Sequence, residues 1–152
     1  MNHLYEQLTA LKLTGFRDAL KKQLAQPGTY QELGFEERLS LLTAEELTCR
    51  ENRKAERLIK HARFRLNAEL SKLDYRSLSQ GNWLTLKQNI LLTGATGSGK
   101  TFLACALGHN ACRQGYKVYY YRLKALMEQC YQGHADGRYS KLLTRLNNSD
   151  LL

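Results

Sequence analysis

The pattern of leucines and charged residues along the chain predicts a helical first part. Leucines recur at three- and four-residue spacing through the first 26 residues, which predicts two short helices separated at Gly15 and stopped by Pro27 and Gly28. Apolar positions then keep helical spacing from Phe35 to about Leu66, with no proline or glycine between them. This stretch predicts one long helix.

After residue 88 the apolar pattern changes. Residues 89–93 and 117–121 are short apolar runs typical of buried parallel strands, and helices are expected over residues 101–114, 123–132 and 139–147. The alternation predicts an α/β fold, with a parallel sheet covered by helices on both faces and preceded by an all-helical region. The expected domains are therefore residues 1–66 and 89–152, joined by a linker over residues 67–88.

A glycine-rich motif lies between the first expected strand and its helix. It fits G-x-x-x-x-G-K-[ST] and consists of Gly94, Ala95, Thr96, Gly97, Ser98, Gly99, Lys100 and Thr101. The glycines allow the backbone N–H groups to surround phosphate oxygens, and the following helix adds the positive end of its dipole. Lys100 is expected on the β- and γ-phosphates and the Thr101 hydroxyl on Mg²⁺. The motif predicts a P-loop that binds ATP with Mg²⁺.

Few carboxylates follow the second expected strand. Glu128 falls in an expected helix, Asp136 in a loop, and Asp150 where a third strand would begin. P-loop ATPases use acids after a later strand to hold Mg²⁺ and to orient the attacking water. We therefore expect the chain to end inside its own ATPase domain, with an incomplete sheet. Its catalytic residues are unknown, and whether it is an enzyme stays open.

The excess of positive charge is concentrated in the long helix and beyond. The chain has 23 Lys and Arg against 14 Asp and Glu, a net charge of +9. The cations of residues 50–65 are Arg50, Arg53, Lys54, Arg57, Lys60, Arg63 and Arg65. Several recur at three- and four-residue spacing opposite apolar positions, which favours sequence-tolerant contact with a DNA backbone. The alternative is a solvated face on which Glu51 and Glu56 form local ion pairs.

Other features indicate an intracellular protein. No apolar run is long enough to span a bilayer, and the N-terminus does not have the pattern of a secretory signal. We therefore expect a cytoplasmic protein with no membrane partner. The four cysteines are far apart and form no CxxC pair, which favours reduced thiols packed in helices.

Four separated segments resemble the IstB-like ATP-binding proteins, the helper ATPases of insertion-sequence transposition. They are the P-loop and residues 35–39 (FEERL), 51–54 (ENRK) together with 61–66 (HARFRL), and 103–109 (LACALGH). The resemblance implies an AAA+ ATPase domain behind a helical N-terminal domain. It also implies assembly on DNA with ATP, self-association of the full-length protein, and assistance to a transposase. The family's acidic Mg²⁺ pair would follow residue 152.

Two alternatives remain open beside a transposition helper. One is a replication helicase loader of the same ATPase class, which would differ in its partner rather than in its nucleotide site. The other is a catalytically inactive, truncated remnant.

Overall fold

The computed structural model describes residues 2–68 and 81–152, so most of the expected linker lies outside the described residues. The Cα positions divide the chain into two compact units, Met1–Arg53 and Lys54–Leu152. The expected division into residues 1–66, 67–88 and 89–152 stays a prediction. Each unit is described below by itself.

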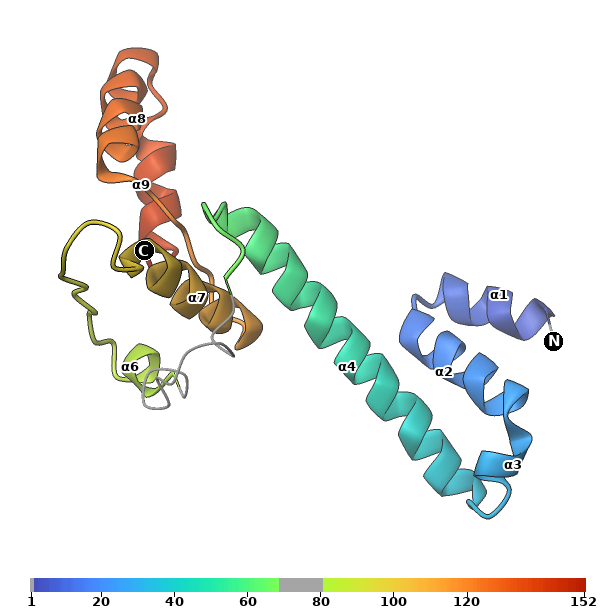
Figure 1. The fold of residues 1–152 in the computed structure, drawn as a ribbon. Coiled ribbons are helices and arrows are strands. Elements are labelled where there is room, and N and C mark those ends of the chain that lie inside the picture. Colours follow the sequence, from blue (N-terminus) through green and yellow to red (C-terminus); the bar gives the residue numbers. More distant parts are fainter. Residues whose placement is uncertain (1, 69–80) are drawn as a thin grey trace. The chain divides into compact units, whose positions relative to one another are not determined.

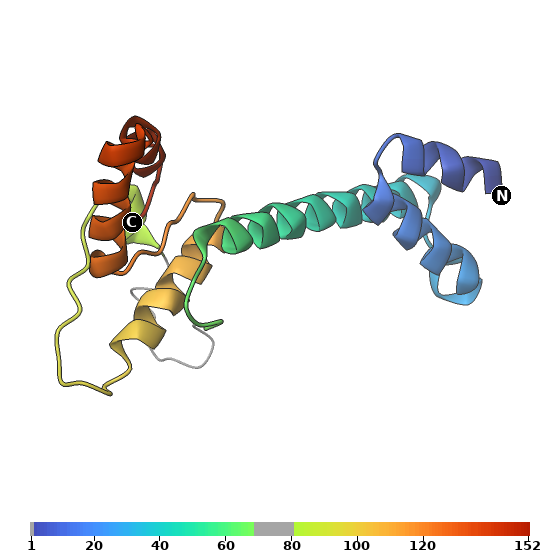
Figure 2. The ribbon, with the colours of Figure 1, turned by 90° about the horizontal axis from the view of Figure 1, so that it is seen from above.

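The first unit is helical. It contains α1 (Asn2–Ala10), α2 (Thr14–Ala25), α3 (Pro27–Tyr30) and the first part of α4 (Phe35–Ala62). Helices α1 and α2 lie side by side (Figures 1 and 2). Pro27 begins α3 at a position where its missing N–H leaves no hydrogen bond unmade.

The break between α1 and α2 was expected at Gly15, and that expectation is wrong. The chain turns at Lys12, which adopts a φ of 59°, and the Leu13 N–H donates to the Leu8 carbonyl at 2.8 Å. Gly15 is buried inside α2, where an added Cβ would lie 2.7 Å from the Cβ of Cys49. Glycine is needed here because α2 and α4 approach closely, not because the helix ends.

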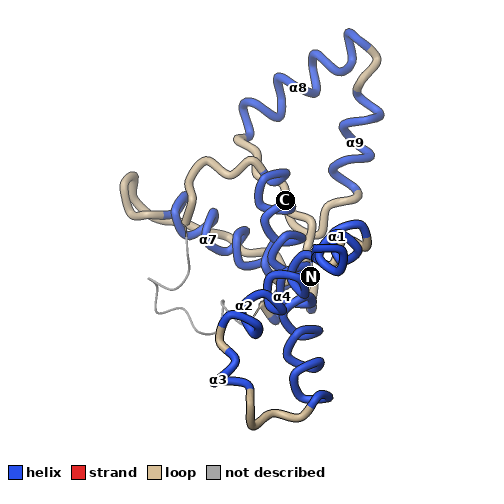
Figure 3. Tube along the Cα trace, turned by 90° about the vertical axis from the view of Figure 1, so that its right-hand side faces the viewer, coloured by secondary structure: helices blue, strands red, loops and turns tan. Residues whose placement is uncertain are grey.

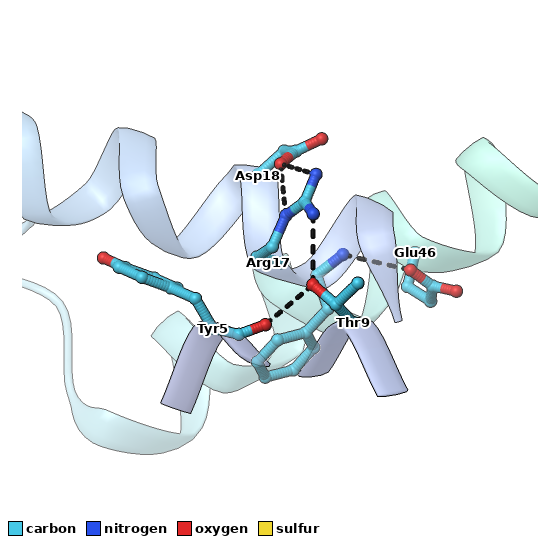
Figure 4. A network of polar contacts seen from close by, with 6 residues as sticks. Tyr5, Thr9, Arg17, Asp18 and Glu46 are labelled. Atoms are coloured by element: carbon cyan, nitrogen blue, oxygen red, sulfur yellow. Dashed lines mark hydrogen bonds and ion pairs between the residues drawn. The ribbon is translucent and has the colours of Figure 1, made fainter. Parts of the chain in front are cut away.

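A buried carboxylate ties α2 to α4. Glu46 on α4 is 6% exposed and accepts a hydrogen bond from the Phe16 N–H at 3.1 Å (Figure 4). Its other oxygen accepts from Nε of Arg50 at 2.7 Å. Burial raises the pKa of Glu46, but the hydrogen bonds from Arg50 and from the amides of Phe16 and Gly15 together lower it below its ordinary value. The ionised form of Glu46 is therefore part of the packing of this unit.

The core of the second unit forms around the buried residues of α7 (Lys100–Arg113). After the end of α4, its elements are α6 (Asn82–Thr85), α7 (Lys100–Arg113), α8 (Leu123–Asp136) and α9 (Tyr139–Asn147). Helices α8 and α9 form a hairpin (Figure 3). The buried clusters contain Ala62, Ala111, Cys112 and Val118 in one, and Ala68, Cys105 and Ala106 in the other. Phe64 packs against both clusters, so it joins the end of α4 to α7.

The α/β fold with a parallel sheet is corrected by the structure. Residues 2–68 and 81–152 contain helices and loops but no strand (Figure 3), and the sole β-type pairing among them is an isolated parallel bridge between Val118 and Leu151. A sheet needs neighbouring backbones that exchange a series of hydrogen bonds. The N–H groups of residues 119 and 120 instead donate to the carbonyls of Leu151 and Ala62. Residues 89–93 form a loop that pairs with no strand among the described residues, and Leu91 is 88% exposed.

The cysteines agree with the expectation of reduced thiols in helices, and α4 begins at Phe35 as expected but ends at Ala62 rather than near residue 66. All four cysteines are free thiols in helices. Burial raises the pKa of the Cys112 thiol to about 11, so this thiol stays protonated at neutral pH. Among the helices of the described ranges, none is both long enough and apolar enough to cross a bilayer.

Candidate nucleotide-binding site

The glycine-rich motif forms a loop that leads directly into α7. All three of its glycines have positive φ: Gly94 at 145°, Gly97 at 88° and Gly99 at 83°. Gly99 is the N-cap residue of α7 and lies in the left-handed region, with no side chain capping the helix. An added Cβ at Gly97 or Gly99 would meet open space. These two positions therefore require glycine for their backbone angles rather than for lack of room.

The side chain of Lys100 folds back over the loop. Its ammonium donates to the carbonyls of Gly94 at 2.7 Å and Ala95 at 2.5 Å, and lies 3.3 Å from Oγ of Ser98. The first residue of α7 thus binds the first residues of the motif and closes the loop around a positive charge. The Leu103 N–H donates to the Gly99 carbonyl at 3.0 Å, so the amides of residues 100–102 precede the helix's own hydrogen-bond ladder.

Helix α7 is anchored at its far end and accessible at its first turn. Residues 105–109, 111 and 112 are buried, whereas Lys100, Thr101 and Phe102 are half-buried and the loop residues 94–99 are exposed. A buried C-terminal half fixes the direction of the helix axis. The N–H groups and the positive dipole end of α7 are then presented at an accessible surface, an arrangement suited to anions.

The expected metal ligand and the acidic residues lie in different places. Thr101 is in the first turn of α7, next to Lys100. Glu128 is exposed within α8, and Asp136 is the last residue of that helix, where it pairs with Arg138 at 2.8 Å. Asp150 accepts a hydrogen bond from the Lys117 N–H at 2.7 Å. Within the described ranges, His, Cys, Asp and Glu side chains form no group of three that could hold a metal ion.

The cations expected to contact DNA lie along the second half of α4 and just beyond it. Arg53, Arg57 and Lys60 are exposed and form no ion pair in the part of the chain that the structure describes. Glu51 and Glu56, the local partners in the alternative interpretation, form none there either. These three cations are therefore available to an external polyanion.

The other cations expected to contact DNA either lie beside other groups of the chain or follow the end of α4. Arg50 donates to the buried Glu46. An added Cβ on Gly115 would lie 3.0 Å from Nζ of Lys54, so this ammonium lies beside the turn that follows α7, at the negative end of the helix dipole. Arg63 and Arg65 follow the end of α4 and are exposed, and Arg63 adopts a φ of 55°.

Sequence reasoning missed the residue that positions α7. Phe64 contacts the ring of His109, with the centroids 4.4 Å apart, and its own ring lies over Gly108. The available signal was a glycine in the interior of a helix, which is costly unless another group needs the space.

The chain matches the family model described as IstB-like ATP binding protein over residues 6–152. It is 41% identical to a protein of Pseudomonas fluorescens named as an ATP-binding protein of insertion sequence IS1162, over 99% of this chain and 70% of that protein. It is 34% identical to a protein of Sinorhizobium fredii named as an insertion-sequence ATP-binding protein, y4pL, over 97% of this chain and 64% of that protein.

A third relative is a Mycobacterium tuberculosis protein named as an ATP-binding protein in an insertion sequence. It is 31% identical, over 88% of this chain and 57% of that protein. The chain thus spans between 57% and 70% of the lengths of these three relatives. The match to the family model covers almost the whole chain and agrees with the resemblance carried by the P-loop and the three other motifs, so the chain belongs to the IstB-like ATP-binding proteins.

Proposed function

We propose that residues 94–101 bind the phosphates of ATP, with Mg²⁺ on the Thr101 hydroxyl. The loop and the first turn of α7 supply backbone N–H donors, positive φ at three glycines and an accessible surface. Backbone N–H groups of glycine-rich turns that lead into a helix bind anions. Thr101 offers the hydroxyl oxygen that a hard cation prefers. When bound, Mg²⁺ neutralises charge on the phosphates, and the loop and α7 hold the phosphate chain in place.

The observation that carries this proposal is the position of the Lys100 ammonium inside the loop. It is held by neutral acceptors, the carbonyls of Gly94 and Ala95. Hydrogen bonds from an ammonium to charged phosphate oxygens are stronger than those to neutral carbonyls. Incoming phosphates therefore replace these acceptors, and the lysine changes partners within the same loop.

The test is Mg-ATP binding by calorimetry with Lys100→Ala. We expect affinity to fall by at least tenfold, since a charge-assisted contact contributes about 1.5–3 kcal/mol. Lys87→Ala is the matched control, because Lys87 is an exposed lysine outside the loop. Equal affinities of Lys100→Ala and the control would contradict the proposed site. A titration without Mg²⁺ tests the metal separately and is expected to give weaker binding.

We also propose that the protein assists DNA transposition, binding DNA without sequence preference and acting with a transposase. This rests on the insertion-sequence names of its relatives and on the exposed cations of α4. Backbone contact by Arg and Lys supplies affinity but carries no base information, which suits a helper that accepts many target sites. Self-association of the full-length protein belongs to the same proposal.

A further inference from the structure

A basic surface pocket lies in the second unit, and none of the residues that line it belongs to the P-loop. Its cavity volume is about 350 Å³, and its cationic lining consists of Arg63, Arg122 and Arg145, with His61 beside them. These side chains come from three places: the end of α4, the residue that precedes α8, and α9. Tyr119 and Tyr121 also line it, with ring centroids 6.4 Å apart.

The pocket contains positive charge without a compensating negative charge. None of its lining residues is Asp or Glu. Arg63, Arg122 and Arg145 are exposed and form no ion pair within the described ranges. Three guanidinium groups around one cavity repel one another unless an anion lies between them. Guanidinium groups also match the geometry of phosphate better than ammonium groups do.

The backbone around the pocket is fixed by local structure. The Tyr120 N–H donates to the Ala62 carbonyl at 3.0 Å and holds the end of α4 against residues 118–121. Arg63 follows that carbonyl with a φ of 55°, which turns the chain out of the helical path. Arg122 is the N-cap of α8 and leaves the first turn of that helix without a side-chain cap. The N-terminal N–H groups and dipole of α8 therefore add to the positive field near Arg122.

We propose that this pocket binds a backbone phosphate of DNA, so that the DNA-binding surface extends from α4 onto the α8–α9 hairpin. The inference rests on the DNA binding in the proposed function. It adds Arg122 and Arg145, which lie far from α4 in sequence. Continuity favours DNA over a free nucleotide, because the exposed Arg57 and Lys60 come just before the pocket residues His61 and Arg63 on the same segment. The phosphates of one duplex are spaced closely enough to meet several such cations.

The experiment measures duplex DNA affinity against salt concentration for Arg122→Ala/Arg145→Ala. The control is Lys124→Ala/Lys141→Ala, which removes the same charge from α8 and α9 at exposed positions outside this pocket. We expect the pocket variant to bind at least tenfold more weakly at low salt. Its log–log salt slope should fall by about 1–2, since each lost phosphate contact removes roughly 0.9. The control should change far less, and thermal unfolding verifies that both variants fold.

Three other outcomes overturn the inference in different ways. A pocket variant that matches the control, while charge reversal on α4 abolishes binding, refutes the pocket and leaves the proposed DNA function standing. A pocket variant that keeps DNA affinity but loses ATP affinity in a parallel titration assigns the phosphate to a free nucleotide instead. A wild-type chain that does not bind DNA refutes the proposed DNA function and this inference together.

Discussion

The ring of Phe64 occupies the space that a side chain on residue 108 would need. A Cβ built on Gly108 would lie 2.4 Å from Cε1 and 2.8 Å from Cζ of that ring. Phe64 follows the end of α4, and Gly108 is in the buried part of α7. The absence of a side chain at one residue thus lets the segment after α4 lie directly on the helix that begins at the P-loop.

We predict that Gly108→Ala lowers the free energy of unfolding by about 1 kcal/mol, and by up to about 2 kcal/mol. Alanine improves helix propensity by up to about 1 kcal/mol, but overpacking costs about 1–3 kcal/mol. Urea unfolding measures the difference. Gly28→Ala is the control, because an added Cβ there meets nothing within 4 Å. In the double variant Gly108→Ala/Phe64→Leu, the smaller leucine side chain should relieve part of the overpacking cost. Strictly additive changes in the free energy of unfolding would contradict the contact.

Nucleotide affinity should depend on the left-handed backbone at Gly99. Gly99→Ala places a Cβ at a φ of 83°, which costs about 1–2 kcal/mol and shifts the loop away from its phosphate-binding form. We expect Mg-ATP affinity to fall about 5- to 30-fold, measured by calorimetry. Gly137→Ala is the matched control, since Gly137 has a φ of 74° and an added Cβ there also meets open space. Gly137 lies at the C-cap of α8 and not in the P-loop. If both variants lost the same ATP affinity, the effect would not be local to the loop.

Acid should destabilise the first unit through Glu46. Its pKa in the folded chain lies below the ordinary value of 4.5, so its contribution to stability is fully present above that value. The contribution is lost as the pH falls through the folded-state pKa. We expect Glu46→Gln to be less stable than wild type near pH 7 and to show a smaller loss of stability on acidification, measured by urea unfolding followed by circular dichroism. Glu45→Gln is the exposed control, and a Glu46→Gln curve parallel to wild type would contradict the prediction.

The exposed cations of α4 should be needed for DNA binding. We predict that Arg53→Glu/Arg57→Glu/Lys60→Glu abolishes measurable duplex binding at physiological salt, because all three are exposed and form no ion pair in the described ranges. Fluorescence anisotropy of a labelled duplex measures the affinity. Reversal of Lys12, Lys21 and Lys22 gives the same change in net charge at exposed positions of the first unit, outside the proposed DNA-binding surface. Equal losses in the two triple variants would indicate a general charge effect instead of a binding face.

Local sequence signals predicted the helices better than the pairing of extended segments. The start of α4 at Phe35 and the end of α7 before Gly115 follow from acidic residues in the first turn and from a glycine after the last. Gly15 lies inside α2 and does not end a helix, because glycine occurs both at helix ends and where two helices touch. Residues 89–93 and 117–121 have strand composition, but they do not pair with each other among the described residues.

The sequence by itself determined the family and the candidate phosphate loop, because the P-loop motif is contiguous and its required angles are met by glycines at fixed spacing. Tertiary structure decided which side chains share a surface. It brings Arg63, Arg122 and Arg145 around one pocket and seats Phe64 on Gly108, although these residues are far apart in sequence. Such contacts depend on how separated segments pack, and neither periodicity nor composition contains that information.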